Sequence, residues 1–257
     1  MKYIVANWKM NKTTVEANDF FSELSKNYTP AKNTQVIICP PFTALSDAAS
    51  TLTELGIGLG AQNIHTNSHG AFTGEISGGM LRDLGTRFVL IGHSERRAQA
   101  NETDAIVNKK IAAAFESNIT PIICIGETKI EREDGSFKSV LKSQIETSLD
   151  NIELGKESNK VTPLIFAYEP VWAIGTGLVA TPDIIAGTHT YLKDIIVQTI
   201  SSRGITAMHV PLLYGGSATD QNAQEILSVP NVDGLLIGGA ALDAVKFSKI
   251  ISVAQSI

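Results

Sequence analysis

Short apolar, β-branched runs recur about every thirty residues along the chain, and stretches with a helical repeat of apolar residues separate them. Several runs lack in–out alternation, which is typical of parallel strands buried on both faces. Two of the intervening stretches have clear helical faces, formed by Ile106, Ile111, Ala112, Ala114 and Phe115 and by Val140, Leu141, Ile145 and Leu149. We predict strands at Tyr3–Asn7, Gln35–Pro40, Gly58–Gln62, Phe88–Ile91, Thr120–Ile125, Leu164–Ala167, His209–Tyr214 and Gly234–Ile237.

Eight strand–helix units without a linker or a break in composition fit one closed α/β barrel, (β/α)8, and we predict a single domain over residues 1–257. A doubly wound sheet is the competing fold, and it expects a glycine fingerprint after its first strand. Here the first strand runs into Asn7–Asn11, which contains no glycine. The glycines at 56, 58 and 60 have the wrong spacing, and Gly155-Lys156 lacks the upstream glycine of a phosphate loop.

The composition is that of an ordinary soluble globular protein, with 43% hydrophobic and 18% charged residues. A net charge of -5 argues against a nucleic-acid partner but leaves room for a small anionic substrate at a local positive cluster. No segment approaches the roughly 20 apolar residues of a transmembrane helix, and Met1–Asn11 does not resemble a secretory signal, so we expect no membrane partner. Two widely spaced cysteines, Cys39 and Cys124, favour a reducing compartment, and we expect the cytoplasm.

Polar side chains with chemical potential follow several of the predicted strands, whose carboxyl ends share one face of a barrel. The first unit supplies Asn7 and Lys9, which are two residues apart and are therefore predicted on the same side of the strand. The fourth supplies His93, followed by Glu95, and the sixth supplies Glu169. We expect these side chains to converge at the mouth of the barrel.

Glu169 is the most informative of these residues. The apolar run Thr162–Ala167 delivers it to a strand end, Pro170 stops the strand, and the turn Gly175–Gly177 is typical of a hinged flap whose amides can approach an anion. A lone base under a movable lid suits proton abstraction when the intermediate must be kept from water. An ordinary solvated loop carboxylate is the alternative.

His93 is predicted to open a helix, where burial and the helix N-terminus favour a neutral ring that donates a hydrogen bond. A structural histidine is the alternative. Lys9 is predicted to reach into the mouth, and Glu95 to pair with Lys9 or Arg96. The remaining histidines show no metal-ligand spacing and are read as surface or packing residues: His65, His69, His189 and His209.

Glycine turns follow the last two predicted strands, at Gly215-Gly216-Ser217 and at Gly238-Gly239-Ala240. Each alone could simply turn a tight corner. Together they occupy adjacent units at the position where barrels often hold phosphate, and their backbone amides can come close to an anion. We therefore predict an anion site.

These segments resemble the triosephosphate isomerase family over essentially the whole chain, in matching order and spacing. The matching segments are Ala6–Asn11, Gly70–Glu75, Ile91–Arg97, Cys124–Glu127, Tyr168–Gly177, Tyr214–Ser217 and Val232–Ala240. The resemblance implies interconversion of dihydroxyacetone phosphate and glyceraldehyde 3-phosphate, a step of glycolysis and gluconeogenesis, without a metal or organic cofactor.

The resemblance also implies a role for each matching residue. Glu169 is similar to the family's base, His93 to its neutral electrophile and Lys9 to its positive charge beside Asn7. The phosphate cradle would be the amides of Gly175, which joins only when the flap closes, Ser217, Gly238 and Gly239, with Tyr214 and Ser217 latching the closed flap.

Family members are homodimers, and the resemblance implies that a loop like His65–Glu75, with Thr73 at its tip, inserts into the partner. Three positions depart from the family pattern: Leu178 replaces a frequent lysine, Ala241 a usual serine, and Lys193 an arginine that faces the counterpart of Asp233. Two other hypotheses stay open, a sugar-phosphate lyase with Lys9 as Schiff-base nucleophile and a phosphate-binding protein without catalysis. The role of Cys124 also stays open, between packing and catalysis.

Overall fold

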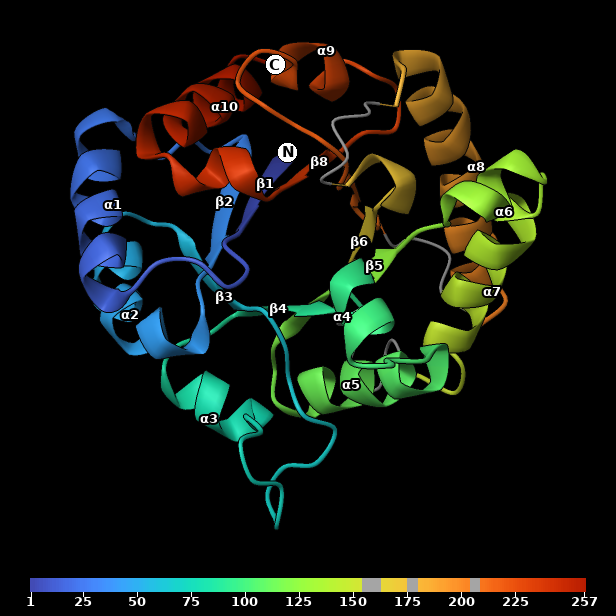
Figure 1. Ribbon diagram of the computed structural model, residues 1–257, viewed down its shortest axis with the longest axis horizontal. Helices are drawn as coiled ribbons and strands as arrows, with labels where there is room; N and C mark the ends of the chain where they lie inside the picture. Colours follow the sequence, from blue (N-terminus) through green and yellow to red (C-terminus); the bar gives the residue numbers. More distant parts are fainter. Residues whose placement is uncertain (154–162, 175–179, 204–208) are drawn as a thin grey trace.

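The computed structural model describes residues 1–153, 163–174, 180–203 and 209–257. Within these ranges eight parallel strands pair in chain order and close into a barrel, because the first strand also pairs with the last. This confirms the predicted fold class. Figure 1 shows the strands at the centre and the helices around them. The strands are β1 (Lys2–Asn7), β2 (Thr34–Cys39), β3 (Gly58–Ala61), β4 (Phe88–Ile91), β5 (Thr120–Ile125), β6 (Ile165–Tyr168), β7 (Leu212–Tyr214) and β8 (Gly234–Ile237).

Several of the helices that cover the barrel start at polar caps. Thr13 and Thr128 form capping boxes with Glu16 and Glu131, which satisfy free amides of the first turn. The helices are α1 (Thr14–Asn27), α2 (Leu45–Glu54), α3 (Gly78–Asp83), α4 (Ser94–Gln99), α5 (Asp104–Glu116), α6 (Lys129–Glu133), α7 (Phe137–Ser148), α8 (Pro182–Ser201), α9 (Ala223–Leu227) and α10 (Ala244–Ser256), with short 3-10 turns η1 (Phe42–Ala44), η2 (Val171–Ala173) and η3 (Gly239–Leu242). Across the described ranges, no helix combines the length and the apolar character needed to cross a membrane.

The predicted strands agree with the observed ones to within one residue, except β7. It begins at Leu212 instead of His209, because Pro211 has no N–H to donate to the ladder and only accepts a bond, from the Phe166 N–H at 2.9 Å. β6 extends to Tyr168, which pairs with Ile125 and Tyr214. Glu169 therefore lies directly beyond the last paired residue.

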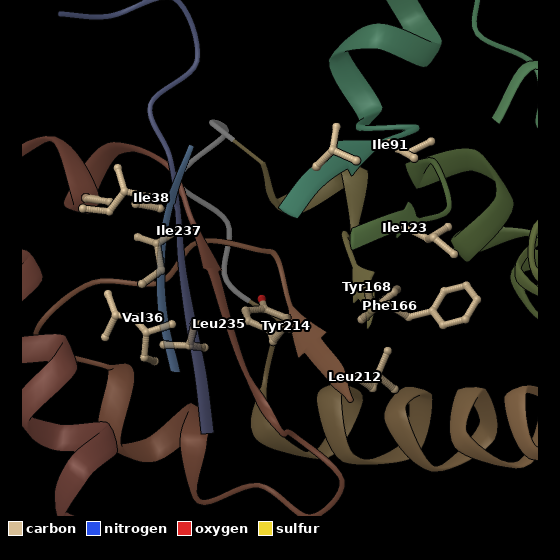
Figure 2. Close-up of a cluster of buried hydrophobic side chains, with 14 of the residues drawn as sticks. Val36, Ile38, Ile91, Ile123, Phe166, Tyr168, Leu212, Tyr214, Leu235 and Ile237 are labelled. Carbon is tan, nitrogen blue, oxygen red and sulfur yellow. The ribbon is translucent and has the colours of Figure 1, made fainter. Parts of the chain in front are cut away.

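Side chains of the strands alternate between two cores. Inward residues such as Ile37 and Cys39 fill the barrel, whereas outward residues such as Val36 and Ile38 pack against the helices. Figure 2 shows the outward set, contributed by several strands. Because both sets are apolar, the sequence lacks visible alternation although the structure alternates strictly. Cys39 and Cys124 are both free and lie in the inner core, where burial raises the pKa of each thiol.

The structure confirms the predicted helical face on α7 and only part of the one on α5. On α7 the buried residues Leu141 and Ile145 match the prediction. On α5 the prediction is partly wrong, since Ile106 is half-exposed and Lys110 is buried. Lys110 tolerates burial because its Nζ lies 2.5 Å from Glu102 Oε1 and 2.6 Å from an asparagine amide oxygen.

Candidate active site

A cavity of about 270 Å³ opens at the carboxyl ends of the strands. The predicted residue Gly175 lies outside the described residues. Every other predicted catalytic or substrate-binding residue lines this cavity: Asn7, Lys9, His93, Glu169, Ser217, Gly238 and Gly239. They come from the first, fourth, sixth, seventh and eighth strand–helix units, so the barrel brings together residues that are far apart in sequence.

Glu169 is a buried carboxylate, with 2% of its surface exposed, and not a solvated loop residue. One oxygen, Oε1, lies 3.0 Å from His93 Nε2, and the other accepts a 2.9 Å hydrogen bond from the Ser94 N–H. Burial raises the pKa of Glu169, but the interactions with His93, the Ser94 amide and Lys9 lower it by more, so its pKa falls below the ordinary value. The carboxylate is therefore ionised at neutral pH.

His93 caps the N-terminus of α4, as the sequence predicts for a histidine that opens a helix. Its Nδ1 accepts the Glu95 N–H at 3.3 Å, so this nitrogen carries no proton. The proton of the neutral ring then sits on Nε2, which faces Glu169. Burial lowers the pKa of His93 and the adjacent Glu169 carboxylate raises it, with a net upward shift in this arrangement.

Lys9 reaches the cavity by a route that the sequence did not predict. It is not an alternating strand position, because β1 ends at Asn7 and Lys9 has a left-handed backbone with φ 53°. The turn is held by Asn7, whose side-chain oxygen accepts the Lys9 N–H at 3.0 Å, and by Gln62, which donates to the Lys9 carbonyl. Lys9 Nζ lies 2.6 Å from Glu95 Oε1, the first of the two predicted pairings.

The turn after β7 passes close to the buried carboxylate. A Cβ on Gly215 would lie 2.9 Å from Glu169 Cγ, and one on Gly216 would lie 2.2 Å from the Tyr214 hydroxyl oxygen. Only glycine fits this close approach at either position. Ser217 donates a 2.7 Å hydrogen bond to the Ala173 carbonyl and so joins this turn to the segment after Glu169.

Sequence reasoning missed several contributors to the site, among them one backbone amide and two apolar side chains. The Ser94 amide binds Glu169, and its position directly after His93 was the available signal. Ile174 and Leu236 add apolar lining to the cavity. Leu236 is the inward residue of β8 between the outward Leu235 and Ile237, so strand parity could have identified it.

Two of the three positions that depart from the family pattern lie within the described residues, and both take part in local hydrogen bonds. Lys193 Nζ lies 2.5 Å from Asp233 Oδ2 and also donates to the Val210 carbonyl, while the Leu212 N–H donates to the same carboxylate. Ala241 contributes its backbone carbonyl, which accepts from the Trp8 indole N–H at 3.1 Å. Leu178 lies outside the described residues. Over the described part of the chain, no group of three or more His, Cys, Asp or Glu side chains could hold a metal ion.

Comparisons with known proteins agree with this geometry. The family model described as "Triosephosphate isomerase" matches residues 2–254. The chain is 43% identical over 251 residues to "Triosephosphate isomerase" of Aquifex aeolicus and 42% identical over 252 residues to that of Moorella thermoacetica, covering 97% and 98% of this chain and 98% of each relative. A crystal structure of triosephosphate isomerase from Bartonella henselae superposes with a TM-score of 0.82 at 37% identity, covering 98% of each chain. The chain belongs to the triosephosphate isomerase family.

Proposed function

We propose that residues 1–257 form one catalytic domain that interconverts dihydroxyacetone phosphate and D-glyceraldehyde 3-phosphate by proton transfer through an enediol(ate). The names of the relatives support this reaction. The observation that carries the mechanism is the pair of Glu169 and His93, with 3.0 Å between Oε1 and Nε2, at a cavity that Lys9 also lines.

Glu169 acts as the base. Its carboxylate takes a proton from the carbon next to the substrate carbonyl, the C–H electron pair forms a C=C bond, and the carbonyl oxygen becomes an enediolate oxygen. Returning the proton to the neighbouring carbon exchanges the aldehyde and ketone positions. The lowered pKa of Glu169 keeps the base ionised before substrate binds.

His93 and Lys9 stabilise the charge that develops on oxygen. The Nε2–H of His93 donates to the enediolate, and the Lys9 ammonium adds positive charge. When the Glu169 carboxylate turns toward substrate, its upward contribution to the pKa of His93 falls, and burial and Lys9 lower that pKa against the smaller upward effect of Glu95. The ring is then neutral, and it can move a proton between the two substrate oxygens.

The glycine turns after β7 and β8 supply the phosphate cradle. The amides of Ser217, Gly238 and Gly239 border the cavity, and Gly175 is proposed as the fourth contributor when the flap closes. Backbone amides at glycine turns bind phosphate without a side-chain cation. This arrangement needs no metal or organic cofactor for proton transfer.

The Schiff-base lyase is less well supported. A Schiff base requires the free amine, whereas Lys9 is ion-paired with Glu95 at 2.6 Å. Borohydride treatment with substrate separates the two reactions, since only the lyase gives a trapped adduct on Lys9.

A coupled assay of glyceraldehyde 3-phosphate conversion tests the proposal. We expect the wild-type chain to be active and Glu169→Asp to lower kcat by about 10²- to 10³-fold, because the shorter side chain withdraws the base from carbon. The inhibition constant of inorganic phosphate should stay within about twofold, since the cradle is untouched. An inactive wild type contradicts the function, and an undiminished kcat of Glu169→Asp contradicts the role of the base.

We also propose that the chain acts as a cytoplasmic homodimer. Residues 67–75 are exposed and project from the barrel between β3 and α3, at the lower edge of Figure 1. A second cavity, of about 280 Å³, lies beside Lys9 and His93 and is lined in part by Met10 and Phe42, which are 97% and 37% exposed. Exposed apolar groups around a cavity favour a partner, and the loop around Thr73 of a second copy is the proposed occupant. Sedimentation of Thr73→Arg should show monomers, and an unchanged dimer would contradict the insertion.

A further inference from the structure

Gln144 lies outside the catalytic cavity, on α7, yet both ends of its side-chain amide are engaged. Its Oε1 accepts the Gly126 N–H at 2.8 Å, and its Nε2 donates to the Gly126 carbonyl at 3.0 Å. Gly126 is the first residue after β5, and the pairing of β5 with β4 has already ended at Ile123. The side chain of Gln144 therefore replaces a neighbouring strand and fixes both polar groups of this one residue.

Gly126 in turn lies against the backbone of Glu169. A Cβ on Gly126 would be 1.8 Å from the Glu169 carbonyl oxygen and 3.4 Å from its Cα. On either side of this contact, the Glu169 N–H donates to the Ile125 carbonyl at 2.7 Å and the Val171 N–H to the Glu127 carbonyl at 3.1 Å. Segments 125–127 and 169–171 thus continue the pairing of β5 and β6, and any displacement of Gly126 is passed to Glu169.

The contact between Gly126 and Glu169 borders a cavity on the side of α4, α6 and α7. This cavity has a volume of about 250 Å³ and is bordered by Gly126, Gln144, Glu169 and Val171 among others. A void provides no contacts that would resist displacement. Within the part of the chain that the structure describes, the side-chain hydrogen bonds that hold Gly126 are the two with Gln144 on α7.

We infer that Gln144 is a positioning residue for proton transfer: by clamping Gly126 it sets the backbone position of the base, Glu169. The inference rests on the proposed function, since it needs Glu169 to be the base. Gln144 does not line the catalytic cavity and acts only through Gly126. Proton transfer is sensitive to displacements well below 1 Å, so a loosened Gly126 reduces turnover without affecting the distant phosphate cradle.

Gln144→Met tests this directly, because methionine keeps the unbranched shape and removes both hydrogen bonds. We expect kcat to fall about tenfold while the inhibition constant of inorganic phosphate stays within about twofold. Gln144→Asn is the milder variant; it keeps the polar group but is one methylene too short to reach both atoms of Gly126, and the same separation is expected. A kcat within twofold of wild type in both variants overturns the inference, and so does a loss of phosphate binding that equals the loss of kcat.

Ile145→Val is the matched control, since it trims the neighbouring buried residue of α7 and leaves Gly126 untouched. It should lower the midpoint of thermal unfolding without changing kcat by more than twofold. A fall of kcat equal to that of Gln144→Met would assign the effect to helix stability and overturn the inference.

A double variant gives a further test. In a Glu169→Asp background, where the base is already displaced, Gln144→Met should lower kcat by less than about threefold, and an undiminished tenfold loss of kcat overturns the inference as well. An inactive wild type would instead contradict the proposed function, whereas an active wild type with normal Gln144 variants contradicts the positioning role alone.

Discussion

Glu127 and Glu169 follow neighbouring strands, within two residues of the ends of β5 and β6, and both are almost fully buried. Their surroundings differ. Glu127 Oε1 accepts hydrogen bonds from the Tyr168 hydroxyl at 3.0 Å and the Trp172 indole at 2.9 Å, and the residue does not line the catalytic cavity. Glu169 faces that cavity and contacts an imidazole.

The pKa values of the two carboxyls shift in opposite directions. Burial raises the pKa of Glu127 by more than its neutral donors and the more distant Arg132 lower it. The pKa of Glu169 falls because His93, the Ser94 amide and Lys9 outweigh burial. Burial alone therefore does not make a base: the groups on the other side of the carboxylate, and an open face toward substrate, decide the role.

The largest expected effect is a difference in kcat between variants of the two glutamates. Glu169→Gln should lower kcat by at least about 10³-fold, because the amide cannot accept the substrate proton. Glu127→Gln keeps an oxygen acceptor for Tyr168 and Trp172 and should lower kcat by less than about tenfold. Steady-state kinetics of the two purified variants measure this, and equal losses would remove the distinction between a base and a structural carboxylate.

The sequence predicted which residues lie at the mouth of the barrel better than it predicted the contacts that hold them there. Glu169, His93 and the glycine turns are found because they directly follow strands, and strand ends converge in any closed parallel barrel. Lys9 was placed correctly for the wrong reason, since its left-handed backbone, and not strand parity, carries it to the cavity. Such a turn depends on Asn7 and Gln62, one of which is distant in sequence.

The buried polar contacts could not be predicted from the sequence. Lys110 counts as a surface residue in any hydrophobic pattern, and only the fold shows Glu102 beside it. The bonds of Gln144 to Gly126 span a helix and a strand end, so no local motif marks them. Patterns predict which elements form and which ends meet, whereas specific polar pairs depend on how helices are placed around the barrel.

A second, smaller effect concerns the buried histidine beside Tyr168, the residue whose hydroxyl donates to Glu127. His189 is fully buried against Tyr168, with 5.8 Å between ring centroids, and its Nδ1 lies 3.0 Å from the Asn231 carbonyl. Burial lowers the pKa of His189 to about 4. The unfolded chain then binds more protons than the folded one between pH 6.5 and 4, so stability falls as pH drops through this window.

His189→Asn removes this titration while keeping an N–H donor near the Asn231 carbonyl. Between pH 7 and pH 5, we expect wild type to lose about 2 kcal/mol more free energy of unfolding than the variant. Urea unfolding at matched protein concentration measures it, since dissociation of a dimer would add the same concentration term to both. If the free energy of unfolding changed equally with pH in the two proteins, the region around His189 would admit water. Glu127 would then be less enclosed than its raised pKa indicates.

The smallest effect is a difference in sign between the two carboxylates. Glu169, with its lowered pKa, contributes stability that is present above the ordinary value of 4.5 and lost as pH falls through the lowered value. Glu127, with its raised pKa, contributes stability that is present below 4.5 and lost as pH rises through the raised value. Relative to wild type, Glu169→Gln should therefore become less stable as the pH of a urea titration is raised from 3 to 5, a window in which the raised pKa of His93 keeps the wild-type imidazole protonated. Glu127→Gln should become more stable relative to wild type as the pH is raised from 4 to 7. Because only the change with pH is compared, the separate costs of each amide for packing and hydrogen bonding cancel. If both differences moved in the same direction, burial alone would govern both groups, and the charge environment of Glu169 would not distinguish it as a base.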